Sequence, residues 1–355
     1  MSEALAGVSD EQARGLLVDL VGTPSPSGEE RAGADLLVSF FETHGREAWL
    51  DEVGNVRAPA DDSLLLTSHI DTVPGDIPVR VEETDGVESL WGRGSVDATG
   101  PLAAMAVAAV ESGVSFAGVV GEETDSRGAR HLVETRDPPD AVVNGEPSGW
   151  DGITLGYRGL LAGTYVATSE SGHTSRPGNN AIEDAIEWWS RVGEAVAADG
   201  DEWTPVFERV TTKPTAIQGG ISDDGLSVEA TMEVQFRVPP SLTTDEVREA
   251  ADGELDGGTV RWHDEVVPVM TNPRSSLASA FRGAIRKAGG DPRLLRKTGT
   301  SDMNVYQTWD CPMVTYGPGN SDLDHAPDEH LSLVEYDDSI AVLEAVADRV
   351  AESDG

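Results

Sequence analysis

The sequence predicts an α/β fold in which a mostly parallel central sheet, flanked by helices, is interrupted by a smaller α+β (ferredoxin-like) domain. Three observations support this class. Strand-like apolar runs alternate with segments of helical periodicity up to about residue 156. Strictly alternating strands and two helices then follow in the order β-α-β-β-α-β. Strand-helix alternation returns from residue 272. We therefore expect one domain formed by residues 1–156 and 272–355, with a domain of residues 157–271 inserted in it.

The individual elements follow from local patterns. Ser9 with Gln12, and Ser27 with Glu30, match the capping-box spacing, which predicts two helices near the N-terminus. In the first domain we expect strands at 64–68, 114–121, 140–146 and 311–319, and helices at 99–113, 124–136, 275–290 and 333–352. In the insert we expect strands at 153–170, 226–239 and 259–267, and helices at 180–198 and 243–255.

The composition restricts the function classes. The chain carries 64 acidic and 25 basic residues, a net charge of -39, and only three of the bases are lysine. A surface for a basic partner is one explanation, but the acids are spread along the whole chain, which favours a solvated coat suited to a salt-rich cytoplasm. Such a surface argues against nucleic-acid or membrane binding. The single cysteine, Cys311, excludes disulfides within one chain, and the acidic N-terminus resembles no secretion signal, so we expect a cytoplasmic protein.

Histidines and carboxylates gather where the predicted strands end. Each alone has an ordinary explanation as a helix cap, a turn residue or part of the acidic surface. Because ligands in α/β folds assemble at the carboxyl ends of strands, their joint occurrence favours a site for two divalent ions that share one carboxylate. The residues are His69 and Asp71 in SHIDTVP, Asp97 in GRGSVDATGP, Glu122 and Glu123 in GEETDSRG, Glu146 in NGEPS, and His325 in DHAPDE.

The order of these motifs resembles the dinuclear zinc peptidase/deacylase family that contains glutamate carboxypeptidase, succinyl-diaminopimelate desuccinylase and acetylornithine deacetylase. The resemblance spans nearly the whole chain and includes SGHTSRPGNNAI and TGTSDMN. It implies two divalent metal ions per chain, with zinc expected and cobalt as an alternative. One ion would be held by His69, Asp97 and Glu146, and Asp97 would bridge to a second ion held by Glu123 and His325.

The resemblance also implies roles for residues outside the ligand set. Glu122 would be the general base that deprotonates a metal-activated water, and Asp71 would orient His69 through a hydrogen bond. The inserted domain would act as a lid and as the dimerisation surface of a homodimer. His173 would stabilise the developing oxyanion of the partner subunit's site. Arg237 would grip a substrate carboxylate.

Within the family, the compact length and the run RKTGTSDMN most resemble the short archaeal hydrolases that release lysine or ornithine from the C-terminal γ-glutamyl link of an amino-group carrier protein, LysW. By this resemblance Thr298, Thr300, Ser301 and Asp302 would be candidates for contacts to the amino acid. Two alternatives stay open. The chain could be a deacylase of small N-acyl amino acids, of the acetylornithine deacetylase or desuccinylase type, or a non-catalytic dimeric binding module.

Overall fold

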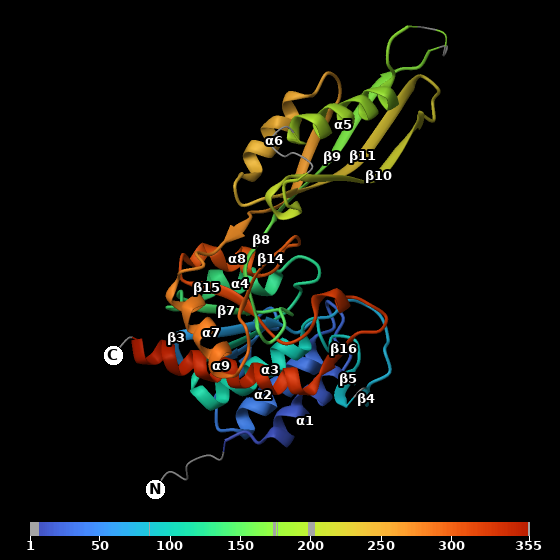
Figure 1. The fold of residues 1–355 in the computed structure, drawn as a ribbon. Helices are drawn as coiled ribbons and strands as arrows, with labels where there is room; N and C mark the ends of the chain where they lie inside the picture. Colours follow the sequence, from blue (N-terminus) through green and yellow to red (C-terminus); the bar gives the residue numbers. More distant parts are fainter. Residues whose placement is uncertain (1–6, 85, 173–174, 176, 198–202, 354–355) are drawn as a thin grey trace. The chain divides into compact units, whose positions relative to one another are not determined.

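The computed structural model describes residues 7–353 apart from residues 85, 173–174, 176 and 198–202. The chain forms two compact units (Figure 1). The first consists of Met1–Gly156, Thr271–Leu295 and Ser301–Gly355, and the second of Tyr157–Met270 and Arg296–Thr300.

A mixed sheet organises the first unit, as the α/β prediction requires. Its strands run in the order β1-β2-β6-β3-β7-β15-β8, with β14 beside β8. The central strands β6, β3, β7 and β15 are mutually parallel, whereas β1, β2 and β8 pair antiparallel with their neighbours. The bounds are β1 Trp49–Leu50, β2 Val56–Ala58, β3 Asp61–His69, β6 Val114–Val119, β7 Val142–Gly145, β8 Gly152–Tyr157, β14 Arg293–Lys297 and β15 Met313–Tyr316.

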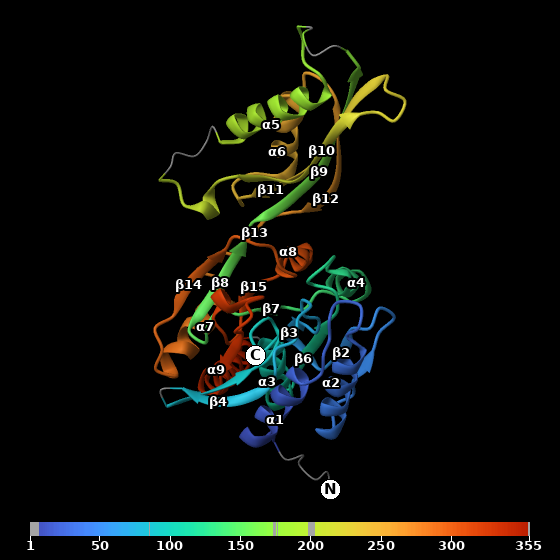
Figure 2. The same cartoon turned by 90° about the vertical axis from the view of Figure 1, so that its right-hand side faces the viewer.

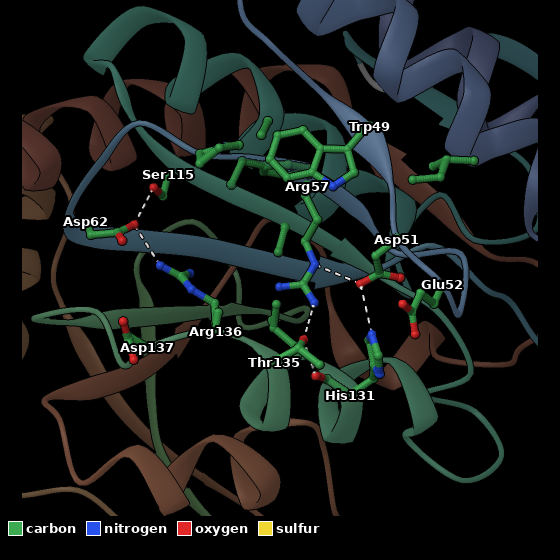
Figure 3. A pocket seen from close by; sticks show the side chains of 16 residues that line it. Trp49, Asp51, Glu52, Arg57, Asp62, Ser115, His131, Thr135, Arg136 and Asp137 are labelled. Carbon is green, nitrogen blue, oxygen red and sulfur yellow. Dashed lines mark hydrogen bonds and ion pairs between the residues drawn. The ribbon is translucent and has the colours of Figure 1, made fainter.

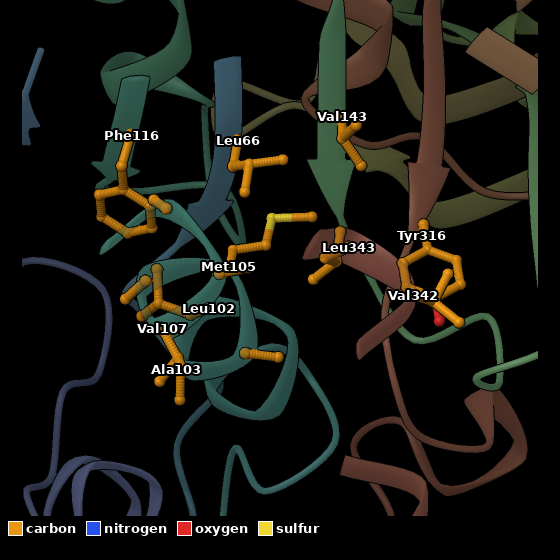
Figure 4. Close-up of a cluster of buried hydrophobic side chains, with 14 of the residues drawn as sticks. Leu66, Leu102, Ala103, Met105, Val107, Phe116, Val143, Tyr316, Val342 and Leu343 are labelled. Atoms are coloured by element: carbon orange, nitrogen blue, oxygen red, sulfur yellow. The ribbon is translucent and has the colours of Figure 1, made fainter. Parts of the chain in front are cut away.

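Helices cover both faces of this sheet (Figure 2). One layer contains α1 (Asp10–Val21), α2 (Arg31–Thr43), α3 (Thr99–Ser112), α7 (Ser276–Lys287) and α9 (Leu333–Ser353). The other contains α4 (Arg127–Thr135) and α8 (Met303–Tyr306). The central helix α3 is buried over nearly its whole length, so its small apolar residues pack between the sheet and α9. Figure 4 shows this core, in which Leu102 and Met105 of α3 lie among Leu66, Phe116 and Leu343.

One of the two predicted capping boxes is confirmed and the other is wrong. Ser9 and Gln12 exchange both hydrogen bonds of the box at the start of α1. Ser27 does not cap α2, because its hydroxyl donates to the carboxylate of Asp71 at 2.7 Å. The Glu30 carboxylate is ion-paired with Arg127 instead of turning back to the chain. Helix α2 therefore begins after Glu30 without a side-chain cap.

The second unit is a four-stranded antiparallel sheet with two helices on one face. Its sheet order is β10-β11-β9-β12, and its chain order is β-α-β-β-α-β, as predicted. Phe236 and its alternating neighbours on β11 pack under the helices, so Arg237 lies on the opposite face. The bounds are β9 Gly159–Glu170, α5 Ala181–Ala197, β10 Thr211–Ile221, β11 Ser227–Val238, α6 Thr244–Gly253 and β12 Thr259–Val266, with the short strand β13 at Val269–Met270.

The segment Arg296–Thr300 groups with the second unit, although the sequence prediction placed it in the first domain. Polar contacts explain this grouping. Arg296 pairs with Glu208 at 2.7 Å, and Arg158 Nε donates to the carbonyl of Thr298 at 3.0 Å.

The sequence reading missed a third, small sheet. It contains β4 (Arg80–Thr84), β5 (Val87–Trp91) and β16 (His330–Ser332) in the order β16-β5-β4. Trp91 pairs with His330 across this sheet, and their rings stack at 4.3 Å between centroids. Among the described residues, no helix has the length and apolar character that a membrane crossing requires.

Candidate metal centre

The order of the central strands explains how distant residues of the chain converge. Strands β6, β3 and β7 are neighbours and parallel, so their carboxyl ends meet at one edge of the sheet. His69 is the last residue of β3, and Glu146 directly follows β7. Glu122 and Glu123 follow β6 in a turn at Gly121, whose φ of +78° is a left-handed conformation suited to glycine.

Asp97 lies between two imidazoles. It sits in the loop before α3, and its Oδ1 is 3.2 Å from His69 Nε2. Its other oxygen, Oδ2, is 3.2 Å from Nε2 of His325. His325 Nε2 is also 3.1 Å from Glu123 Oε1, and His69 Nε2 is 3.9 Å from Glu146 Oε1. One carboxylate thus directs each of its oxygens at a different histidine, which is the arrangement of a bridging ligand.

The described residues contain three groups of side chains whose ligand atoms lie within 4.8 Å of one another. Two of them share Asp97 and correspond to the two ligand sets that the resemblance implies. The groups are His69 with Asp97 and Glu146, Asp97 with Glu123 and His325, and His69 with Glu122 and Glu123. Imidazole nitrogens together with carboxylate oxygens form a donor set that suits zinc and related divalent ions, so these residues fit a pair of such ions.

Asp71 is fully buried and connects the ligand loops. Its carboxylate accepts hydrogen bonds from the backbone N–H groups of Glu122 at 3.0 Å and Glu123 at 3.1 Å, besides the bond from Ser27. His69 Nδ1 lies 2.8 Å from the backbone carbonyl of Asp71 and 3.5 Å from its carboxylate. The backbone of Asp71 therefore fixes the imidazole, and its side chain fixes the turn that carries the two glutamates.

The pKa values show how strongly the cluster attracts positive charge. Burial raises the pKa of the Asp97 carboxyl, but hydrogen bonds with His325 and His69 outweigh it and hold this pKa well below the usual range. The hydrogen bond with Asp97 raises the pKa of His325 to about 9. Burial and the charge of Glu146 raise the pKa of Glu122 well above its ordinary value. Burial and the charge of Asp97 also raise the pKa of Glu123, by a smaller amount. Several carboxylates that compete for protons in a buried place are a suitable environment for cations.

The other predicted site residues do not all belong to the described part of the first unit. His173 lies outside the described residues. Arg237, Thr298 and Thr300 belong to the second unit, where Arg237 Nη1 is 3.4 Å from Thr300 Oγ1. Ser301 belongs to the first unit and is buried, and its hydroxyl accepts a hydrogen bond from the N–H of Met303 at 3.2 Å.

The first unit also contains a cavity of about 620 Å³ that shares no residue with the cluster (Figure 3). Ion pairs join four of the charged side chains that line it. Arg57 Nε lies 2.7 Å from Asp51, and Arg136 Nη2 lies 2.7 Å from Asp62. Arg57 of β2 also donates to Thr135 of α4 at 2.8 Å, and Arg136 directly follows α4. These contacts connect β2, the start of β3 and α4, which indicates a structural network.

Sequence reasoning missed Ser27 and Glu329. Ser27 was assigned to a helix cap, because the capping-box pattern does not reveal a contact 44 residues away. Glu329 stands in the quoted run DHAPDE but received no role, although its carboxylate contacts the loop of Asp97. The only available signal was its place beside His325.

Comparison with known proteins gives consistent results. Residues 65–349 match Peptidase family M20/M25/M40. The LysW-lysine hydrolase of Deinococcus radiodurans is 41% identical, over 96% of this chain and 97% of that protein. The putative LysW-lysine/LysW-ornithine hydrolase of Thermococcus kodakarensis is 38% identical, over 98% and 97%. Among solved structures, the tripeptidase of Staphylococcus aureus has a TM-score of 0.78 at 20% identity, over 98% of this chain and 100% of that chain. The aminopeptidase PepT of Bacillus cereus has a TM-score of 0.77 at 20% identity, over 97% and 99%.

Proposed function

The chain belongs to Peptidase family M20/M25/M40, and on that premise we propose that it hydrolyses the amide bond joining lysine or ornithine to the C-terminal γ-glutamyl group of the carrier protein LysW. Two relatives that match along their full length, at 41% and 38% identity, carry LysW-lysine or LysW-ornithine hydrolase as their names. The reaction would place the enzyme in lysine or arginine biosynthesis.

The observation that carries the proposal is the position of Asp97 between His69 and His325, at 3.2 Å from each. We assign His69, Asp97 and Glu146 to one divalent ion, and Asp97, Glu123 and His325 to the other. Zinc is the proposed native ion, and cobalt would suit the same donors. When bound, the ions would supply Lewis-acid polarisation of the scissile carbonyl and a lowered pKa for an attacking water.

The protein's own groups would then move the proton. Glu122 lies beside the ligands on the same turn as Glu123, and it would accept the proton of the attacking water. Desolvation at its partly buried position and the nearby charge of Glu146 favour the protonated form, so it can hold this proton and deliver it to the leaving amine. Asp71 would keep Glu122 in place through its hydrogen bond to the backbone N–H.

We propose that the second unit acts as the lid of the enzyme and recognises the substrate. Arg237 lies on the sheet face that the helices leave uncovered, where its guanidinium could grip a carboxylate. Thr298 and Thr300 belong to the same unit, and with Ser301 they stay our candidates for contacts to the amino acid. His173 would donate to the developing oxyanion.

The same unit is the proposed dimerisation surface. Strand β10 lies at the end of the four-stranded sheet, and its residues from Pro214 to Ile221 are exposed. Such an edge can pair with a second copy of the chain. If His173 acts on the partner's site, a mixture of His173→Ala and Glu122→Ala chains should regain part of the activity that each variant lacks. Absence of rescue would contradict a shared site.

A salt-rich cytoplasm is the proposed environment. The net charge of -39 produces strong self-repulsion at low ionic strength, and salt screens it. The same screening would let the enzyme approach a carrier protein that is itself acidic.

A substrate panel in molar salt tests the proposed function. Purified protein loaded with zinc is compared on LysW-linked lysine, LysW-linked ornithine, acetylornithine and succinyl-diaminopimelate. Turnover of the carrier-linked substrates, with little on the small amides, is the expected result. Turnover of acetylornithine alone would favour the small-molecule deacylase. Two bound ions per chain without turnover of any amide would favour a binding module.

A further inference from the structure

Glu329 holds a position that the proposed reaction does not explain. It lies four residues after His325 and is only 1% exposed. Its four hydrogen bonds come from Arg93 Nη1 at 2.7 Å and from the backbone N–H groups of Gly94 at 3.1 Å, Val96 at 2.9 Å and Asp97 at 3.1 Å.

These bonds join two segments that are far apart in the sequence. Arg93 also donates to the carbonyl of Ala326 at 3.2 Å, and the N–H of Gly92 contacts the carbonyl of Glu329 at 3.4 Å. The next residues on either side, Trp91 and His330, pair between β5 and β16. The loop that carries Asp97 is therefore bound along its length to the segment that carries His325.

We propose that Glu329 is a positioning residue that holds Asp97 and His325 at the separation required by the ion they share. The inference rests on the metal centre proposed above, but it does not depend on the substrate. The ion assigned to His69, Asp97 and Glu146 has two ligands that Glu329 does not position. The Asp71 carbonyl holds His69, and Glu146 directly follows a central strand. Loss of the Glu329 contacts should therefore lower the affinity for the ion held by His325 more than the affinity for the ion held by His69.

Glu329→Gln tests this asymmetry with little change in volume. A carboxylate offers acceptors on both oxygens, whereas the amide group of glutamine has an NH₂ on one side. That NH₂ would face either the N–H groups of Val96 and Asp97 or the donors of Arg93 and Gly94. The loop would lose at least two of its hydrogen bonds in either orientation.

The readout is a Co²⁺ titration of metal-free protein, followed by the absorbance of the bound ions and by competition with a chelator. We expect Glu329→Gln to lower the affinity for the ion held by His325 about 10- to 100-fold, which is the usual cost of losing a group that orients metal ligands. The affinity for the ion held by His69 should change about threefold or less. His325→Ala provides the reference, since it removes a ligand of the same ion. Without metal, amide hydrogen exchange of residues 92–98 should be faster in Glu329→Gln.

Asp51→Asn is the matched control. Like Glu329, its carboxylate is paired with an arginine and accepts hydrogen bonds from backbone N–H groups, and its side chain is 10% exposed. It lines the cavity of Figure 3, and within the described part of the chain no hydrogen bond or ion pair joins it to a residue of the centre. It should leave both Co²⁺ affinities unchanged. If Glu329→Gln does not fold, Arg93→Lys is the milder variant, with the same asymmetry expected. Unchanged affinity for both ions, or equal loss of both, overturns the inference. A parent protein that binds fewer than two ions contradicts the metal centre itself.

Discussion

Asp302 is a buried carboxyl group whose ionisation should destabilise the metal-free protein. It is 1% exposed, and within the described part of the chain its Oδ1 has no hydrogen-bond partner. Burial raises its pKa from 3.8 to about 6, while a hydrogen bond with Ser126 and the charges of His69 and Arg130 oppose the rise. We predict that Asp302→Asn, which removes the ionisation and keeps the shape, stabilises the metal-free protein.

The size of the effect follows from the pKa. A carboxyl group with a raised pKa in the folded state binds its proton more tightly there than in the unfolded chain. Its stabilising contribution is complete below the unfolded pKa and is lost as the pH rises through about 6. The rise from 3.8 to about 6 corresponds to about 3 kcal/mol at pH 8, and to about 1 kcal/mol at pH 4.5. Asp302→Asn should gain up to these amounts in the free energy of unfolding.

Urea unfolding of chelator-treated protein in molar salt, at both pH values, measures the difference. Asp51→Asn serves as the control, because that carboxylate has several hydrogen-bond donors and its replacement should lower stability. An Asp302→Asn variant no more stable than the parent at pH 8 would refute the reasoning. An equal gain at both pH values would show that packing, and not ionisation, is responsible. With metal bound the gain should shrink, because the ions' positive charge already favours the carboxylate.

Three further predictions concern single residues. Glu122→Ala should retain both metal ions, by elemental analysis, while its turnover falls by about 10²- to 10⁴-fold, the usual contribution of a general base; an unchanged rate would remove that assignment. Ser27→Ala deprives the buried Asp71 carboxylate of a donor and should cost about 1.5–3 kcal/mol in urea unfolding, whereas a purely capping serine would cost less. Burial raises the pKa of the Cys311 thiol to about 11, so its alkylation by iodoacetamide at pH 8 should be slow and should accelerate as the pH approaches 11; rapid labelling at pH 8 would contradict the burial.

The fold was largely predictable because its patterns are local. Alternating burial along β11 and the helical periodicity of α5 are visible in the sequence, and so is the β-α-β-β-α-β order of the insert. The hairpin of β4 and β5 was missed because its strands are short and mostly exposed, so they carry no clear apolar alternation. Their pairing with β16 depends on contacts across most of the chain.

For the candidate centre, the positions of the metal ligands were predictable from the sequence, but the contacts that support them were not. Strand ends pointed to the positions of His69 and Glu146, since neighbouring parallel strands bring their carboxyl ends together. The supporting contacts were not predictable. Neither the bond from Ser27 to Asp71 nor the bonds from the Asp97 loop to Glu329 follow from spacing, because each joins segments whose proximity only the complete fold determines.

The two halves of the centre are completed at different points along the chain. His69, Asp97 and Glu146 all precede residue 147, whereas the other group also needs His325, which follows the inserted unit in the sequence. The insertion therefore separates the donors of one group and leaves those of the other together. A change in the His325 loop removes a donor from one group alone, whereas a change at Asp97 affects both.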